Sequence, residues 1–428
     1  MLSSSCILFA LLLKVIISHQ TELNIHGTVA NGWEMIQDRF KENFLQQREL
    51  GASIAIYHQE KLVVNLSGGW FNRSQTKSYN KDTLQLVFSA TKGLVAATVA
   101  LCVQRGLLNY SELVTKYWPE FRKNGKANTT VAHIMSHRAG LPFDSGLVED
   151  YLNWTGMVHY LEQSSPVWEP GTNHGYHALT YGWLAGELVR RVDPKKRSLG
   201  QFVRDEIGQV LDIEFYIGLP SIEQYRVSPL DIKPIDDGSN ETLSEQYSVF
   251  NEHYVHQAEI PGGNGITNAR SLARFYASLI GDVEDNKHYK RLLNDDILQQ
   301  ATKSNTPDNE IDYVVNVITN FSMGFLIMNQ MYPLLGHGVF GHVGASGSIG
   351  FAIPSKNLSF AYVTNLIVSP GSDGIDPRYK PILNEISAIL NRSNSANSNK
   401  KLCSYFFILC YLVGHQLYFH RSFATHII

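Results

Sequence analysis

The sequence predicts an α+β fold in which helices flank an antiparallel sheet and a mostly helical lobe adjoins it. Apolar and polar residues alternate near both ends of the body of the chain, at 51–71 and again between 321 and 366. The long stretch between these segments has helical periodicity instead. Strands at both ends with helices between them imply one sheet that is built from distant segments.

The first elements of this fold lie between residues 33 and 106. A helix is expected over 33–47, and two antiparallel strands joined by a turn at HQEK are expected over 51–71. Residues 89–105 are apolar almost all round beyond their first turn, which is typical of a helix deep in a core. Gly106 is placed to end that helix.

Beyond residue 106, the sequence predicts helices and loops, then strands, then a closing helix. Helices are expected at four stretches, namely 156–163, 179–192, 199–211 and 267–279. Strand-like alternation returns at three, namely 321–328, 347–354 and 358–366. A final helix is expected over 375–390.

These elements predict a single two-lobed domain over residues 21–390. One α/β lobe would comprise about 21–88 together with 261–390, and the mostly helical lobe would comprise about 89–260. The chain carries a formal charge of −3 and contains no long basic run, so nothing indicates a nucleic-acid partner. Only Cys102 lies between the apolar ends of the chain, which excludes an intrachain disulfide in the body.

Both ends of the chain carry apolar segments. Residues 1–20 contain an apolar run of the length found in signal peptides, interrupted by Lys14. After a polar linker that starts at 391, residues 402–419 are apolar within the C-terminal segment 391–428. This stretch fits a membrane anchor, a removable tail for a lipid anchor, or a helix lying on a surface. We favour membrane association.

Acceptor motifs for N-glycosylation support entry into the secretory pathway. Nine Asn-x-Ser/Thr motifs occur, at Asn65, Asn72, Asn109, Asn128, Asn153, Asn240, Asn320, Asn357 and Asn391. Together with the N-terminal segment, they predict a secreted or membrane-anchored protein whose folded domain faces the lumen or the outside.

The pattern S-x-x-K occurs four times, so its spacing alone carries little information. Only the pair Ser89 and Lys92 opens a buried apolar helix, where the three-residue step places both side chains on one face. Burial favours a neutral lysine, and a neutral amine can take the proton of a serine nucleophile. Ser89 would also suit an ordinary helix N-cap, and the two roles are compatible.

Five ordered blocks around this pair carry a family resemblance. They are FSATKG, HIMSHRAGLP at 133–142, PGTNHGYHALTYGWLAGE at 170–187, GGNGITNARSLARF at 262–275 and GHVGASGSIGF at 341–351. Their order and spacing resemble the serine β-lactamase-related family, in its class C-like branch with β-lactamase-fold esterases and animal β-lactamase domain-containing proteins. The resemblance covers about residues 25–390 and implies a β-lactamase/transpeptidase-like fold.

The resemblance implies a role for each matched residue. Ser89 matches the acylated nucleophile, Lys92 its helix partner, and Tyr176 the tyrosine of the Y-x-N element, which shares proton transfer. A tyrosine near a cation is expected to ionise more easily than usual. His342 and Gly344 match the K-T-G strand element, and the backbone amides of Ser89 and Ala345 would form an oxyanion hole.

Two departures from the family pattern bear on the substrate. Ala178 stands where the family has the asparagine of Y-x-N, and His342 replaces the usual lysine. A neutral imidazole attracts a substrate carboxylate less than lysine does, so β-lactam turnover is in doubt. Both changes also occur among esterases of this fold. The resemblance therefore implies a serine hydrolase acting on a small-molecule acyl substrate, an ester or an amide, without a cofactor.

Other interpretations remain open at this stage. A metal site at His133 and His137 has the spacing for helical chelation but lacks the H-E-x-x-H glutamate, and we expect no metal. Glu149 matches a class A E-x-x-L-N string without its companion S-D-N. The protein could also be a non-catalytic or self-assembling binding protein that retains the fold, or a small-peptide peptidase. The sequence leaves the oligomeric state open.

Overall fold

The computed structural model describes residues 23–232, 247–368 and 374–392. The predicted signal peptide at 1–20, the apolar stretch 402–419 and the motif at Asn240 lie outside the described residues. Within those ranges, no helix has the length and apolar content needed to cross a membrane.

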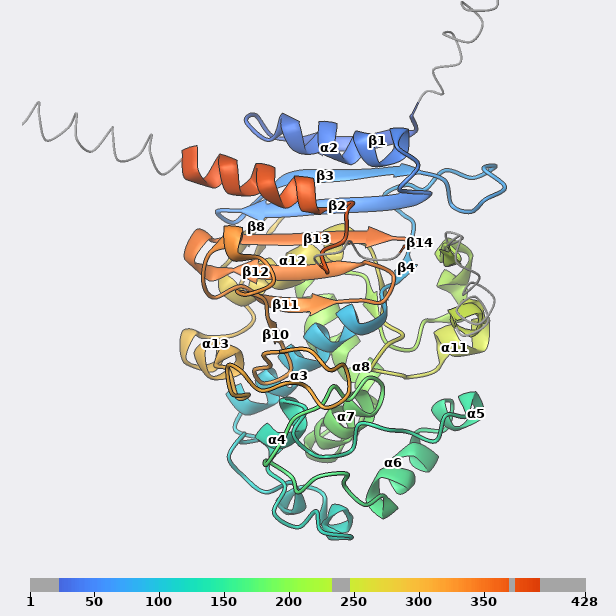
Figure 1. The fold of residues 1–428 in the computed structure, drawn as a ribbon. Helices are drawn as coiled ribbons and strands as arrows, with labels where there is room; N and C mark the ends of the chain where they lie inside the picture. The colour runs from blue at the N-terminus through green and yellow to red at the C-terminus, as the bar shows by residue number, and fades with distance from the viewer. Residues whose placement is uncertain (1–22, 233–246, 369–373, 393–428) are drawn as a thin grey trace, which may run out of the picture.

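A nine-stranded sheet lies in the upper half of the molecule as drawn in Figure 1. Its strands follow the order β10-β11-β12-β13-β2-β3-β8-β9, and β1 pairs with the free part of β3. Their bounds are Ile25–Val29 for β1, Gly51–His58 for β2, Lys61–Gly69 for β3, Val283–Glu284 for β8, His288–Tyr289 for β9, Leu326–Ile327 for β10, Phe340–Val343 for β11, Ile349–Ile353 for β12 and Leu358–Thr364 for β13. Every pairing is antiparallel except that of β3 with β8.

The centre of this sheet joins the two ends of the chain. β13 runs antiparallel to β2, in a register from Leu358 opposite His58 to Thr364 opposite Ala52. The prediction of one sheet built from distant segments is therefore correct. The expected hairpin at 51–71 is also present, as β2 and β3.

Alternation along β2 divides the molecule into layers. Ile54 and Ile56 point into a core that they share with α2 (Glu34–Leu45) and the helix at 380–392. Ala55 and Tyr57 point into the other core. Because neighbouring side chains of a strand face opposite sides, a continuous apolar strand can serve two cores at once.

The second core contains the helical lobe, which lies below the sheet in Figure 1. Its central helix α3 (Thr91–Gln104) is buried from Thr91 to Cys102, as the all-round apolar sequence predicts. Gly106 follows with φ of +69°, the left-handed conformation expected at a helix end. The other described helices are α4 (Val131–Met135), α5 (Val148–Tyr151), α6 (Trp154–Gln163), α7 (Thr180–Val192), α8 (Leu199–Val203), α9 (Gln209–Leu211), α11 (His253–Gln257), α12 (Ala269–Ile280) and α13 (Asp295–Thr302).

Two small sheets link the lobes. In one, β4 (Gln85–Leu86) and β5 (Phe215–Tyr216) flank β7 (Ile266–Thr267). In the other, β6 (Asp231–Ile232) pairs in parallel with β14 (Leu366–Ile367). β4 fixes the backbone just before Ser89, at the junction between the lobes.

Three predicted elements differ in extent. The expected strand at 321–328 is reduced to β10, because a tight turn closed by Ser322 N–H and Phe325 O, with Gly324 at φ of +95°, interrupts it. The expected helix at 199–211 contains a π-helical segment at Arg204–Gly208. The closing helix begins at 380 rather than 375, since Pro377 disfavours helical backbone in the residue before it.

Candidate active site

Ser89 lies on a sharp turn between β4 and α3. A 3₁₀ turn over Phe88–Ala90 leads into the helix, and Phe88 has φ of +45°, a strained value for an aromatic residue. The ring of Phe88 packs against Tyr247 and Phe250, which hold it in place. The helix cap has no side-chain hydrogen bond, so Ser89 does not act as an N-cap here.

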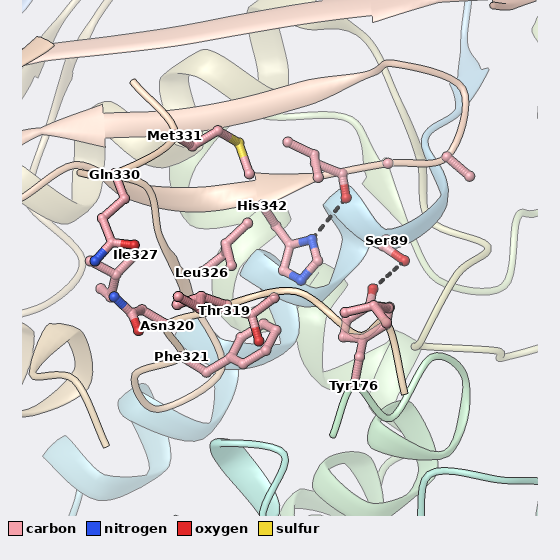
Figure 2. A pocket seen from close by; sticks show the side chains of 15 residues that line it. Ser89, Tyr176, Thr319, Asn320, Phe321, Leu326, Ile327, Gln330, Met331 and His342 are labelled. Atoms are coloured by element: carbon pink, nitrogen blue, oxygen red, sulfur yellow. Dashed lines mark hydrogen bonds between the residues drawn. The ribbon is translucent and has the colours of Figure 1, made fainter. Parts of the chain in front are cut away.

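The hydroxyl of Ser89 is held instead between an amine and a phenol. Lys92 Nζ lies 3.0 Å from Ser89 Oγ, and the hydroxyl of Tyr176 donates to the same oxygen at 2.7 Å. Figure 2 shows Tyr176 below Ser89, with its hydroxyl pointing toward the Ser89 hydroxyl. Residues from the start of α3 and from the loop before α7 thus meet at one oxygen atom, as the sequence blocks imply.

Two main-chain carbonyls fix the amine of Lys92. Nζ donates to Ala178 O at 2.7 Å and to Gly262 O at 2.6 Å, and the side chain is fully buried. Burial holds the pKa of Lys92 well below the ordinary value of a lysine. The missing amide of the Y-x-N element is therefore replaced at Lys92 by backbone oxygens, one of them from Ala178 itself.

Tyr176 corrects one expectation. Its ring lies 4.8 Å from Lys92 Nζ, yet burial raises the pKa of Tyr176 above that of a free tyrosine. The prediction of easier ionisation beside a cation is wrong, because the phenolate would lose its hydration in a site that offers little in return. Tyr176 therefore carries its proton at neutral pH.

The strand β11 and the turn after it form the wall of the site that faces Ser89. His342 is buried, its Nδ1 lies 2.8 Å from Val343 O, and burial lowers the pKa of His342 to about 3. A Cβ atom on Gly344 would lie 2.1 Å from Val87 O, so only glycine permits this approach. The turn thereby comes close to the segment that carries Ser89, and the Ala345 amide has no backbone acceptor among the described residues.

A buried ion cluster supports this turn from behind. Arg378 is fully buried and donates from Nη2 to Ser346 O at 2.8 Å. The carboxylates of Asp376 and Glu49 face the same guanidinium. The Arg378 fork therefore connects two acidic groups to the backbone beside Ala345, and all of these contacts are shielded from water.

A cavity of about 340 Å³ opens beside Ser89. Its wall is mostly apolar and carries no Lys, Arg, Asp or Glu side chain. The lining residues are Ser89, Tyr176, Val315, Ile318, Thr319, Asn320, Phe321, Leu326, Ile327, Gln330, Met331, His342, Val343, Gly344 and Ala345. Figure 2 shows Leu326, Ile327 and Met331 on the side of the cavity away from Ser89.

Sequence reasoning missed the loop that supplies part of this wall. Val315, Ile318 and Thr319 come from a segment with neither regular alternation nor a motif. It also missed Asp312, whose buried carboxylate accepts the backbone N–H of Tyr176 at 3.0 Å. Only the apolar content of IDYVVNVI within an exposed loop could have drawn attention to this segment.

The remaining sequence candidates take no part in this hydrogen-bond arrangement, although the ring of His137 packs 5.1 Å from that of Tyr176. His133 Nδ1 accepts the Thr130 N–H in a capping box, and His137 Nδ1 accepts the His177 N–H. Across the three described ranges, no cluster of metal-ligating side chains is found. Glu149 lies on α5 and is absent from the cavity lining.

Comparison with known proteins places this geometry in a family. The family model described as Beta-lactamase matches residues 27–384. The chain belongs to the beta-lactamase family. It is 32% identical over 360 residues to Esterase/beta-lactamase LipL of Mycobacterium tuberculosis, an alignment that spans 77% of this chain and 80% of that relative.

Solved structures agree with this membership in the beta-lactamase family. A family VIII carboxylesterase superimposes with a TM-score of 0.77 at 30% identity, over 85% of this chain and 99% of the other. EstA from Arthrobacter nitroguajacolicus Rue61a gives 0.74 at 30% identity, over 85% and 98%. The predicted family, the β-lactamase/transpeptidase-like fold and the serine hydrolase class are therefore confirmed.

Proposed function

We propose that this protein hydrolyses small uncharged carboxylic esters through an acyl-enzyme on Ser89, with Lys92 and Tyr176 transferring the protons. The observation that carries the proposal is the position of Ser89 Oγ, held between Lys92 Nζ and the Tyr176 hydroxyl at the edge of an apolar cavity. A nucleophile in contact with a base, and a base fixed by further groups, is the arrangement that activates a serine.

Counting hydrogen bonds supports Lys92 as the base. A neutral amine has two N–H groups and one lone pair, and the carbonyls of Ala178 and Gly262 accept both N–H groups. The lone pair is then left facing Ser89 Oγ. The lowered pKa of Lys92 favours this neutral state before substrate arrives.

In the proposed acylation, each proton that leaves one group is taken up by another. Ser89 Oγ attacks the ester carbonyl carbon while its proton passes to Lys92. The amides of Ser89 and Ala345 stabilise the oxyanion. When the C–O bond to the alcohol breaks, the alkoxide takes the Tyr176 proton, which the Lys92 ammonium replaces. Water then attacks the acyl carbon, returns a proton to Ser89 and releases the acid.

The charge of the cavity supports an uncharged ester. His342 stands where the family has a lysine, and its lowered pKa keeps the imidazole neutral over the physiological range. A substrate carboxylate, such as that of a β-lactam, would therefore meet no cation on this wall. Among the similar proteins named above, one is a carboxylesterase and another is named Esterase/beta-lactamase, which supports ester hydrolysis.

We place this activity in the secretory pathway or outside the cell. Four of the acceptor motifs have asparagines that are exposed in the fold, at Asn109, Asn128, Asn153 and Asn391. Treatment of the expressed full-length protein with an N-glycosidase would lower its apparent mass if the motifs are used. An unchanged mass would contradict this location.

The test is hydrolysis of p-nitrophenyl butyrate and of nitrocefin, an ester without and a β-lactam with a carboxylate. We expect turnover of the ester and little turnover of nitrocefin. Ser89→Ala should abolish ester hydrolysis. Ser74→Ala, which alters another S-x-x-K pair in an exposed loop, should leave it unchanged. Equal ester hydrolysis by Ser89→Ala and the unaltered protein would contradict the proposal.

A further inference from the structure

A single buried carboxylate joins the backbone of Tyr176 to one wall of the cavity. Asp312 is fully buried, and its Oδ1 accepts the N–H groups of Tyr176 at 3.0 Å, Val314 at 2.9 Å and Val315 at 3.1 Å. Its Oδ2 accepts the hydroxyl of Thr319 at 2.9 Å. Four donors therefore converge on one side chain.

The loop over 311–319 depends on this carboxylate for its shape. An isolated bridge between Ile311 and Ile318 closes it, and Asp312 N–H donates to Val317 O at 2.9 Å. No helix or longer strand orders the loop, although Val315 and Ile318 line the cavity. Three polar groups of the loop donate hydrogen bonds to the Asp312 carboxylate. These bonds, rather than regular secondary structure, hold the loop in its shape.

A second set of contacts joins the same loop to the segment before Tyr176. Tyr313 N–H donates to His174 O at 3.0 Å. The buried ring of His174 lies between Glu310, which its Nδ1 contacts, and Thr319, whose hydroxyl lies 3.0 Å from its Nε2. The loop over 311–319 and the segment that carries Tyr176 are thus packed as one unit.

We propose that Asp312 is a positioning residue. It fixes the position of the Tyr176 hydroxyl relative to the apolar wall of the cavity. The inference rests on the proposed ester hydrolysis and goes beyond it. Rate and acyl-chain selectivity are coupled, since one carboxylate fixes both the proton donor at Ser89 and the wall formed by Val315 and Ile318. An ester whose acyl chain reaches that wall should depend on Asp312 more than an acetate does.

An amide in place of the carboxylate separates these effects from unfolding. Asp312→Asn keeps the size of the side chain and one acceptor oxygen, but it loses the charge and turns an NH₂ group toward one set of donors. Asp312→Ala removes every contact and risks loss of the fold. Asp285→Asn is the matched control, because Asp285 is a largely buried carboxylate bound to Arg270 and Arg274, outside the cavity lining.

The experiment compares kcat and KM for p-nitrophenyl acetate and p-nitrophenyl octanoate, per active site titrated with a fluorophosphonate. For Asp312→Asn, we expect kcat to fall by about 10- to 100-fold and the octanoate-to-acetate ratio of kcat/KM to fall by about 10-fold, as misplacement on the order of 1 Å would cause. Asp285→Asn should leave that ratio unchanged.

Each result decides between separate claims. Suppose that the unaltered protein hydrolyses both esters and that Asp312→Asn changes neither kcat per site nor the octanoate-to-acetate ratio of kcat/KM. That result overturns the role of Asp312 and leaves the proposed function standing. A fall in both variants to the same extent would also overturn it, since a general loss of structure would then suffice. An unaltered protein that hydrolyses neither ester overturns the proposed function and this inference with it.

Discussion

Lys92 Nζ donates to the main-chain carbonyl of Gly262 at 2.6 Å, across 170 positions of the sequence. This contact brings the block at 262–275 to the start of α3, and together with Ala178 O it holds the amine through main-chain acceptors. A backbone acceptor cannot be lost by side-chain substitution. The alanine at 178 is therefore compatible with a well-fixed lysine.

Replacing the amine should abolish the chemistry and spare the fold. In Lys92→Met, an unbranched apolar chain occupies the same buried space, while Ser89 loses its base. We expect kcat/KM for p-nitrophenyl butyrate to fall by at least about 10³-fold, with a folded circular-dichroism spectrum. Lys77→Met is the control, since Lys77 belongs to an exposed S-x-x-K pair. Retention of a tenth of the activity by Lys92→Met would contradict Lys92 as the base.

Gly344→Ala tests the proposed oxyanion hole formed by the backbone amides of Ser89 and Ala345. The new Cβ atom would lie 2.1 Å from Val87 O, so the turn carrying Ala345 must move away from the segment carrying Ser89. We expect kcat to fall by about 10²-fold, with a smaller change in KM. Gly281→Ala should be neutral, because its Cβ would meet nothing nearer than 3.7 Å. Equal kcat values for the two variants would show that the close approach is unimportant.

Three buried histidines around the site should make the fold sensitive to acid. Burial lowers the pKa of His177 to about 4 and that of His342 to about 3, and it lowers the pKa of His137 far below its usual value. In the unfolded chain all three titrate near 6.5. Below that pH the unfolded state binds protons that the folded state refuses, so stability is lost as pH falls from about 6.5 toward 4.

The size of this effect can be measured by urea unfolding at pH 7, 6 and 5. Each histidine contributes up to about 1.4 kcal/mol per pH unit within that window. His342→Asn should reduce the slope of the unfolding free energy against pH by up to about 1.4 kcal/mol per pH unit. His159→Asn, at an exposed position, should leave that slope unchanged. The same pH dependence of the free energy of unfolding in His342→Asn and in the unaltered protein would contradict the neutral, buried state of the His342 ring.

The parts of the fold that the sequence predicts are those with strong local patterns. The alternation in β2 and the all-round apolar α3 each reflect a packing environment that repeats along the element. The segment 321–328 alternates equally well, yet the turn at Gly324 limits the strand to two residues. Local alternation therefore indicates burial there without indicating which backbone partner is available.

The site divides in the same way. Ser89, Lys92 and Tyr176 lie in recognisable blocks, so their meeting was predictable from the family resemblance. The carbonyls of Ala178 and Gly262 were not, because every residue carries a carbonyl and only the fold decides which one reaches Nζ. Asp312 was equally hidden, since a lone aspartate in a loop resembles any surface carboxylate until the chain closes around it.

The most direct test of the account is the site of covalent labelling. Incubation with a fluorophosphonate followed by peptide mass spectrometry should find one adduct, on Ser89 in the peptide that contains FSATKG. Lys92→Met and Tyr176→Phe should each slow its formation by at least about 10²-fold. An adduct on a different residue, or labelling of Ser89 at the same rate in all three proteins, would contradict a nucleophile activated by this amine and phenol.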